Sequence, residues 1–298
     1  MTSLRNFKYV CLGFGAEDLE FFIWNDLRNR MTISSRFALN TKNALSYFGI
    51  PGMADLKWLQ HAFLTRKGGT SPFPFHSLNL SIATGDSKDD TAKNKRVIAE
   101  AFEFDPDRLV LLHQKHQDQI LILKDSEGHP PSYLDYDALI TDLPNQFLGI
   151  KTADCLPILV IDRVKKVIAA IHAGRQGTAL SITPKVLQTM EKAFGCARKD
   201  LLIALGPSIG VCCYEIDERV FHPVLEPHSI PKGNGKWMVD LPRVNMVQIK
   251  EEGIKEDQIF WIDLCTACNT DLFFSHRKEG RTGRQLAFIG MIGKRNIH

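Results

Sequence analysis

Two short segments of this 298-residue chain carry side chains that could do chemistry together. Cys155 stands just before one apolar run, and His172 stands near the end of the next. With His116 they form a Cys-His-His set, which matches a zinc site that has three protein ligands and keeps its fourth position open. Water bound to such a zinc ion becomes acidic enough to supply hydroxide near neutral pH. The three residues therefore raise the hypothesis of a catalytic zinc site.

Each of these residues also has a simpler interpretation. A buried cysteine usually behaves as a small hydrophobic side chain, and a single histidine is usually a surface or hydrogen-bonded residue. Cys155 could also be a nucleophile with His172 as its base, an arrangement that needs no metal. Spacing alone leaves these alternatives open, because scattered Cys and His sets are weaker signals than compact paired motifs.

A second group of cysteines lies farther along the chain. Cys265 and Cys268 have C-x-x-C spacing, and the adjacent pair Cys212-Cys213 could complete a four-thiol structural zinc site. A redox pair is a further alternative, although the βαβ setting expected for one is missing. Because the chain has seven cysteines and shows no export signal, we expect reduced thiols. We favour two reduced thiols in a packed turn for the C-x-x-C segment.

Three arginines stand where an anion could bind. Gly174 and Gly177 bracket a loop between a predicted strand and a predicted helix, and Arg175 lies in that loop. Exposed amides at a helix N-terminus attract anions such as phosphate. Arg66 and Arg277 could also meet an anionic group. A tight turn and solvated surface arginines are the alternative explanation.

The hydrophobic pattern predicts the elements that must position these residues. We expect strands over 62–64, 119–123, 157–161, 167–171, 201–205, 258–262 and 286–291, and helices over 89–104, 178–194 and 242–252. The polar turn 162–166 predicts a hairpin that places Cys155 and His172 at neighbouring strand ends. Hairpins mixed with helices indicate an α+β fold with a mixed sheet.

Composition excludes several classes of protein. Apolar residues make up 44% and charged residues 24%, as in ordinary globular proteins. The net charge of +3 is too small to favour nucleic-acid binding, and no apolar run is long enough to span a membrane. We expect a cytoplasmic protein without a nucleic-acid or membrane partner. Pro51-Gly52 predicts a break between an N-terminal extension, residues 1–50, and a single large domain, residues 51–298.

An ordered series of segments resembles one known family. The resemblance runs from about residue 63 to residue 291 and rests on these segments: Thr65-Arg66-Lys67-Gly68-Gly69, Ser77-Leu78-Asn79-Leu80, Gly85-Asp86, Gln114-Lys115-His116, Asp137-Ala138-Leu139-Ile140-Thr141, Thr152-Ala153-Asp154-Cys155-Leu156-Pro157, His172-Ala173-Gly174, Gly206-Pro207-Ser208-Ile209-Gly210, Cys213-Tyr214-Glu215, Phe273-Phe274-Ser275-His276-Arg277 and Thr282-Gly283-Arg284. The family is variously called laccase-domain proteins, multicopper polyphenol oxidases, peptidoglycan editing factors and purine nucleoside phosphorylases.

The resemblance implies a β-sandwich-like centre flanked by helices and makes His116, Cys155 and His172 the metal ligands. It implies zinc-dependent phosphorolysis of adenosine, inosine and methylthioadenosine, and hydrolytic deamination of adenosine. Copper-dependent oxidation of phenols has also been ascribed to the family, and one copper ion could occupy the same site. Purine nucleosides and phosphate are then the expected partners of a monomer or homodimer.

Further residues are candidates for roles in this chemistry. Asp154 is the candidate proton shuttle, and Arg66, Asn79, Arg175 and Arg277 are candidate substrate-binding residues. The family usually continues His-Ala-Gly with Trp-Arg-Gly, whereas this chain has Arg175-Gln176-Gly177. Either the arginine has moved by one position or its role is lost.

Overall fold

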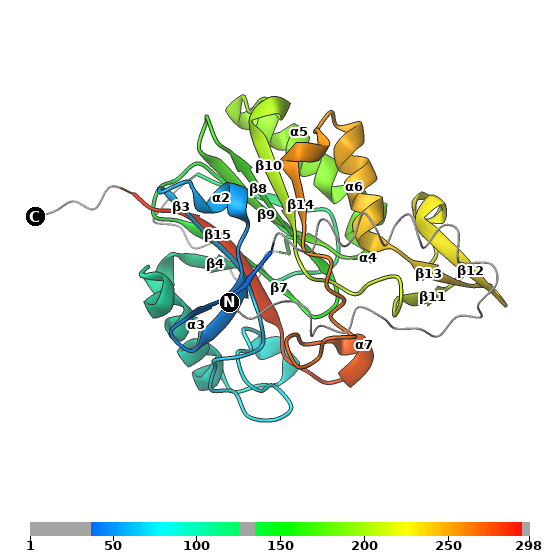
Figure 1. Cartoon of the computed structure of the whole chain (residues 1–298), viewed down its shortest axis with the longest axis horizontal. Helices are drawn as coiled ribbons and strands as arrows, with labels where there is room; N and C mark the ends of the chain where they lie inside the picture. The colour runs from blue at the N-terminus through cyan, green and yellow to red at the C-terminus, as the bar shows by residue number, and fades with distance from the viewer. Residues whose placement is uncertain (1–36, 125–134, 294–298) are drawn as a thin grey trace, which may run out of the picture.

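Two six-stranded mixed sheets form the centre of the protein. The computed structural model describes residues 37–124 and 135–293 (Figure 1). In the first sheet, neighbouring strands follow the order β1 (Leu39–Lys42), β2 (Leu45–Phe48), β3 (Leu59–Leu64), β15 (Gln285–Met291), β7 (Phe147–Thr152) and β4 (Leu109–Leu111). In the second sheet the order is β14 (Ile259–Trp261), β10 (Leu201–Leu205), β8 (Leu156–Asp162), β9 (Val167–Ala173), β6 (Ala138–Thr141) and β5 (Ile120–Leu123). The expected α+β fold with mixed sheets is confirmed.

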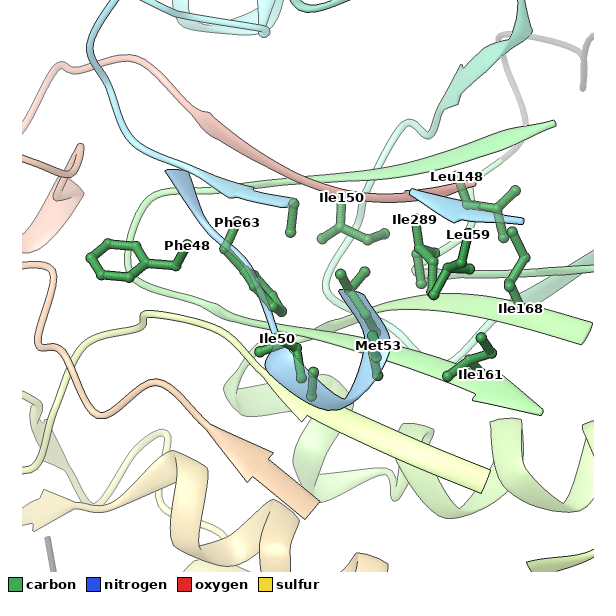
Figure 2. Packing of buried hydrophobic residues seen from close by; sticks show 14 of the residues in the cluster. Phe48, Ile50, Met53, Leu59, Phe63, Leu148, Ile150, Ile161, Ile168 and Ile289 are labelled. Atoms are coloured by element: carbon green, nitrogen blue, oxygen red, sulfur yellow. The ribbon is translucent and has the colours of Figure 1, made fainter. Parts of the chain in front are cut away.

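The two sheets pack face to face and helices cover their outer sides. Phe63 and Ile150 of the first sheet belong to the same buried cluster as Ile161 and Ile168 of the second (Figure 2). Helix α3 (Lys88–Phe102) packs on the outer face of the first sheet. Helices α5 (Ile182–Phe194) and α6 (Leu241–Glu251) cover the second. Since each fully buried aliphatic or phenyl side chain contributes about 1.5–3 kcal/mol, this sandwich is a rigid support for the loops at its ends.

Shorter elements complete the described residues. The α-helical turns are α2 (Pro51–Ala54), α4 (Arg175–Ala179) and α7 (His276–Glu279). The 3₁₀ turns are η2 (Ile82–Thr84), η3 (Pro106–Arg108), η4 (Arg198–Asp200), η5 (Pro223–His228) and η6 (Glu256–Gln258). A small third sheet has the order β11 (Glu215–Asp217), β13 (Lys236–Val239), β12 (Ser229–Gly233). None of the helices in the described ranges is long and apolar enough to cross a membrane.

The predicted hairpin of β8 and β9 is confirmed and is the element that matters most for the site. The strands pair antiparallel, with Leu156 opposite Ala173 and Pro157 opposite His172. Every residue of both strands is buried, because the sheet is covered on both faces. Cys155, directly before β8, therefore lies beside the end of β9 that carries His172.

The prediction of one helix over 178–194 is wrong at its start. The structure has α4 and then α5, and Ser181 between them adopts a left-handed backbone with φ 58°. Pro184 explains the break, because its ring would clash with the carbonyl four residues earlier and it has no N–H to donate. In the first turn of α5 that N–H would have no partner in any case, so the proline is tolerated there.

The structure also locates part of the expected N-terminal extension. Residues 1–36 lie outside the described residues, but β1 and β2 are strands of the first sheet. Leu45, Phe48 and Ile50 are fully buried, and β2 pairs with β3 through Tyr47 and Phe48. The expected boundary at residue 50 thus falls just after two strands that belong to the sandwich.

Candidate metal centre

His116, Cys155 and His172 meet at one end of the second sheet. One ligand atom from each lies within 4.8 Å of the others. The two imidazole rings are 4.8 Å apart between centroids and are inclined at 74°, so their nitrogens can point at a common centre. Tetrahedral zinc needs ligand atoms about 3.5 Å apart at its usual bond lengths. The three side chains therefore fit one divalent ion.

Asp137 is the residue that holds two of these ligands in place. Its carboxylate accepts hydrogen bonds from the backbone N–H groups of Lys115, His116 and Gln117, at 3.2, 3.0 and 2.8 Å. It also contacts His172 Nδ1 at 2.7 Å. A carboxylate on the far nitrogen fixes the tautomer of a ligand histidine and leaves the other nitrogen free to bind metal. One buried side chain thus positions both imidazoles.

The shape of the site leaves room on one side. Gly174 faces the three ligands, and a Cβ there would lie 3.2 Å from Cys155 Sγ and 3.2 Å from His116 Cδ2. A side chain at position 174 would therefore crowd two of the three ligands, whereas the φ of −69° itself does not require glycine. His172 is buried, Cys155 is half-buried and His116 is exposed. A fourth ligand position would consequently open toward solvent on the His116 side.

Charge at the site favours a thiolate. Burial raises the pKa of Cys155, but the nearby charge of His172 and hydrogen bonds with both histidines outweigh burial and lower it to about 6. Burial lowers the pKa of His172, whereas the Cys155 charge and the hydrogen bond to Asp137 raise it to about 9. Because a metal ligand must be a thiolate and a neutral imidazole, a bound cation would take over the charge-balancing role of the imidazole proton.

Asp154, the candidate proton shuttle, lies beside this set with φ 92°. Its carboxylate accepts hydrogen bonds from Thr266 Oγ1 and from the backbone N–H of Arg277, both at 2.7 Å. The Asp154 carbonyl accepts a further bond from Ile209 N–H at 2.8 Å. The residue therefore links the start of β8 to two other loops. Its role in proton transfer stays a prediction.

Arg175 and Arg277 come together in one open cavity of about 270 Å³, although they are distant in sequence. Tyr214 also lines the cavity, and the Arg277 guanidinium lies 5.3 Å from its ring centroid. Burial raises the pKa of Tyr214 to about 12, and the negative charge of Cys155 adds to the shift. Tyr214 thus lines the cavity and lies close enough to Cys155 for its charge to act on the phenol.

Arg66 and Asn79 lie elsewhere. Arg66 is buried and donates to Glu279, to the Thr270 carbonyl and to the His76 carbonyl at 2.7–2.9 Å. Asn79 is fully buried, and its Oδ1 accepts from Arg284 N–H at 2.8 Å. Neither belongs to the metal set or lines the cavity, so their role in substrate binding stays a prediction.

Sequence reasoning did not single out Asp137, Tyr214 or Arg284 as candidate site residues. Burial lowers the pKa of Arg284, while the charges of Cys155 and Asp154 raise it, so this arginine lies near both. For Asp137 a signal was available, since an acidic residue directly precedes the apolar run 138–140. Such a carboxylate needs buried donors to be stable there.

Comparisons with known proteins agree with this picture. The family described as multi-copper polyphenol oxidoreductase laccase matches residues 60–292. Purine nucleoside phosphorylase YlmD of Geobacillus stearothermophilus is 35% identical over 240 residues, which are 76% of this chain and 88% of that protein. A purine nucleoside phosphorylase of Bacteroides thetaiotaomicron is 34% identical over 260 residues, or 83% and 96% of the two chains.

A solved structure supports the fold independently. The crystal structure of YlmD from Geobacillus stearothermophilus superposes with a TM-score of 0.80 at 30% identity. The match covers 87% of this chain and 99% of that one. The sandwich that carries the metal set is thus similar to one found by crystallography.

Proposed function

The chain belongs to the multi-copper polyphenol oxidoreductase laccase family, and we propose that it is a zinc-dependent enzyme that cleaves purine nucleosides with phosphate. The observation that carries the proposal is the His116, Cys155 and His172 set, with ligand atoms within 4.8 Å of one another. Relatives named purine nucleoside phosphorylase support the choice of substrate.

The donor set favours zinc. Thiolate and imidazole together suit zinc, and copper is the main competitor for them. When bound, the ion supplies a Lewis acid that polarises a water or a substrate atom. The only other candidate metal group among the described residues is made of cysteines alone. The several histidine-rich sites that a multi-copper oxidase needs therefore have no counterpart there.

Phosphate is proposed to bind between Arg175 and Arg277. In phosphorolysis a phosphate oxygen forms a bond to the ribose carbon, the bond from that carbon to the purine nitrogen breaks, and the base leaves with the electron pair. Two guanidiniums in one cavity can hold a phosphate by paired hydrogen bonds and orient it for this attack. The arginine at position 175 would then do the work of the family's usual arginine one position later.

Deamination of adenosine is proposed as a second reaction of the same site. Water gives up a proton and adds as hydroxide to the purine carbon that carries the amino group; the amino group takes up a proton, its bond to that carbon breaks, and it leaves as ammonia. Asp154 is our candidate for moving that proton. The hydrogen bonds that it accepts from Thr266 and Arg277 fix the orientation of its carboxylate, one residue before Cys155 in the chain.

A metal-quantified turnover assay tests the proposal. We expect purified protein to convert inosine and phosphate to hypoxanthine and ribose 1-phosphate, and adenosine to inosine without phosphate. Activity should follow zinc content and disappear in Cys155→Ala. Turnover of nucleosides by chain stripped of metal would overturn the zinc requirement.

Two other outcomes would each replace the proposal. An acyl adduct trapped on Cys155, formed equally well with a chelator present, would identify a cysteine hydrolase with His172 as base. Stoichiometric zinc with no turnover of any purine nucleoside would identify a metal-binding protein without this activity.

A further inference from the structure

Four cysteine sulfurs gather at a second place in the molecule. Cys212 and Cys213 lie in the turn between β10 and β11, and Cys265 and Cys268 lie in the loop after β14. All four sulfurs are within 4.8 Å of one another. Cys268 Sγ is 3.6 Å from Cys212 Sγ and 3.5 Å from Cys213 Sγ. The sequence favours two thiols in a packed turn for Cys265 and Cys268. The structure adds Cys212 and Cys213 to that turn.

These distances match one metal ion bound by four thiolates. With zinc–sulfur bonds of about 2.3 Å, the edges of a tetrahedron of sulfurs are roughly 3.8 Å long. The group is also compact enough to exclude an iron–sulfur cluster, whose several irons hold their cysteines farther apart. A tetrahedral set of four sulfurs around a single ion is typical of structural zinc.

The backbone around the sulfurs is already arranged for such a site. The two loops are joined by a parallel bridge between Ser208 and Cys265, with a hydrogen bond from Thr266 N–H to the Ser208 carbonyl at 3.0 Å. Gly210 N–H donates to Cys265 Sγ at 3.3 Å. A Cβ at Gly210 would lie 3.3 Å from Cys212 Sγ, a tight contact that glycine avoids. Backbone donors to sulfur stabilise the anionic form that a metal requires.

Four sulfurs in contact with one another also suit a cation. A zinc ion binds cysteine as thiolate, so a divalent cation would displace the thiol protons and balance the charge of all four sulfurs.

The redox state sets one condition. Cys212, Cys213 and Cys265 are free thiols, whereas Cys268 is disulfide-bonded, so the expectation of reduced thiols is wrong for that residue. A phosphine reductant gives two electrons that break the S–S bond and takes the oxygen of a water molecule, so that Cys268 and its disulfide partner each gain a proton and become thiols. The fourth sulfur is therefore available to a metal only in the reduced chain.

We propose that Cys212, Cys213, Cys265 and Cys268 of the reduced chain form a structural zinc site, separate from the His116, Cys155 and His172 set. All four ligand positions are filled by protein, so this ion would have no vacancy for substrate. Its position gives it a task. Arg277 Nη1 donates to the Cys213 carbonyl at 3.3 Å. Thr266, which follows Cys265 in the chain, donates to Asp154. The ion would join the two loops that hold Arg277 and Asp154 beside the catalytic set.

Zinc counting in variants separates the two sites. In phosphine-reduced full-length protein loaded with zinc and passed over a desalting column, we expect about two ions per chain. The double variant Cys212→Ser/Cys265→Ser should retain about one, and His116→Ala/His172→Ala should also retain about one. Cys196→Ser is the matched control, because Cys196 is buried outside both groups, and it should retain both ions.

Cobalt spectroscopy tests the site without altering any of its cysteines. Cobalt added to the reduced His116→Ala/His172→Ala variant should give the absorption bands of a tetrahedral tetrathiolate, and zinc should abolish them. Absence of those bands in a folded variant, checked by circular dichroism, would overturn the proposal. So would unchanged zinc content in Cys212→Ser/Cys265→Ser. Both results leave the zinc requirement for nucleoside cleavage untouched, since that depends on the other set.

Discussion

The two sulfur-containing groups of this molecule differ in what surrounds the sulfur. The His116, Cys155 and His172 set lies where β8 begins and β9 ends, with His116 on a loop, and it combines one thiol with two imidazoles, one of which is exposed. The four-cysteine group lies on two loops and is closed by its own sulfurs. Three protein ligands leave an ion free to act on a substrate, whereas four ligands leave it only a structural role. The difference predicts that replacing a cysteine lowers turnover strongly in the first group and only weakly in the second.

The largest effect should come from exchanging one sulfur in each group. Cys155→Ser removes a ligand from the open set and with it several kcal/mol of transition-state stabilisation, so we expect inosine phosphorolysis to fall by about 1,000-fold or more. Cys265→Ser should change turnover at 25 °C by less than about 10-fold, because its ion touches no reacting atom. Steady-state kinetics at measured zinc content compares the two variants. Equal loss of activity in two folded variants would contradict the assignment of different roles to the two groups.

A smaller effect is expected from Asp137, which contacts the His116, Cys155 and His172 set and not the four-cysteine group. Asp137→Asn cannot hold His172 and the loop of His116 with an ionised carboxylate, so zinc affinity should fall by roughly 10- to 100-fold. Asp135→Asn is the control, since Asp135 is exposed and contacts His113, outside the set. Competition with a zinc chelator measures both variants. Equal affinities in the two would show that Asp137 does not organise the site.

Asp137 also shows where prediction from sequence stops. The hairpin of β8 and β9 follows from two apolar runs around a polar turn, so the closeness of Cys155 and His172 was predictable. The approach of His116 was not, because it depends on β6 pairing with both β5 and β9 and on one carboxylate that binds three backbone N–H groups. Family resemblance supplied that contact, and local patterns could not.

The same limit holds for the loops. Nothing in the local pattern brings Arg175 and Arg277 into one cavity or Cys212 next to Cys268, since both pairings join segments from distant parts of the chain. Loops that bind each other across the end of a sandwich leave no periodic signal. In the sequence, only the presence of arginines and cysteines in these loops indicated that the loops could form a site.

Arg175 gives the next prediction, because it belongs to the cavity and to neither metal group. Arg175→Ala removes a charged hydrogen-bond donor from the proposed phosphate position, and we expect the KM for phosphate to rise by about 10-fold. Zinc content and adenosine deamination without phosphate should be unchanged. Arg163→Ala is the control, since Arg163 is exposed and donates only to the carbonyls of Lys199 and Asp200 among the described contacts. An unchanged phosphate KM in Arg175→Ala would remove Arg175 from the binding site.

The smallest effect concerns acid stability, which must be separated from metal loss. His61 lies in neither group; it is buried, and its Nε2 accepts a hydrogen bond from Ile50 N–H at 2.7 Å. Burial lowers its pKa from 6.5 to about 4. Between these values the unfolded chain binds a proton that the folded chain does not, so stability falls as the pH decreases from 6.5 toward 4.

The expected loss from His61 at pH 5.5, relative to pH 7.5, is roughly 1 kcal/mol. Urea unfolding of metal-free protein at the two pH values should show it, and His61→Gln, which keeps an acceptor for Ile50 N–H, should be less sensitive by that amount. If the variant and the unmodified chain lose the same stability, acid sensitivity arises from other groups. In that case the charge balance within the two metal-free sets becomes the first place to look, because protons replace metal there.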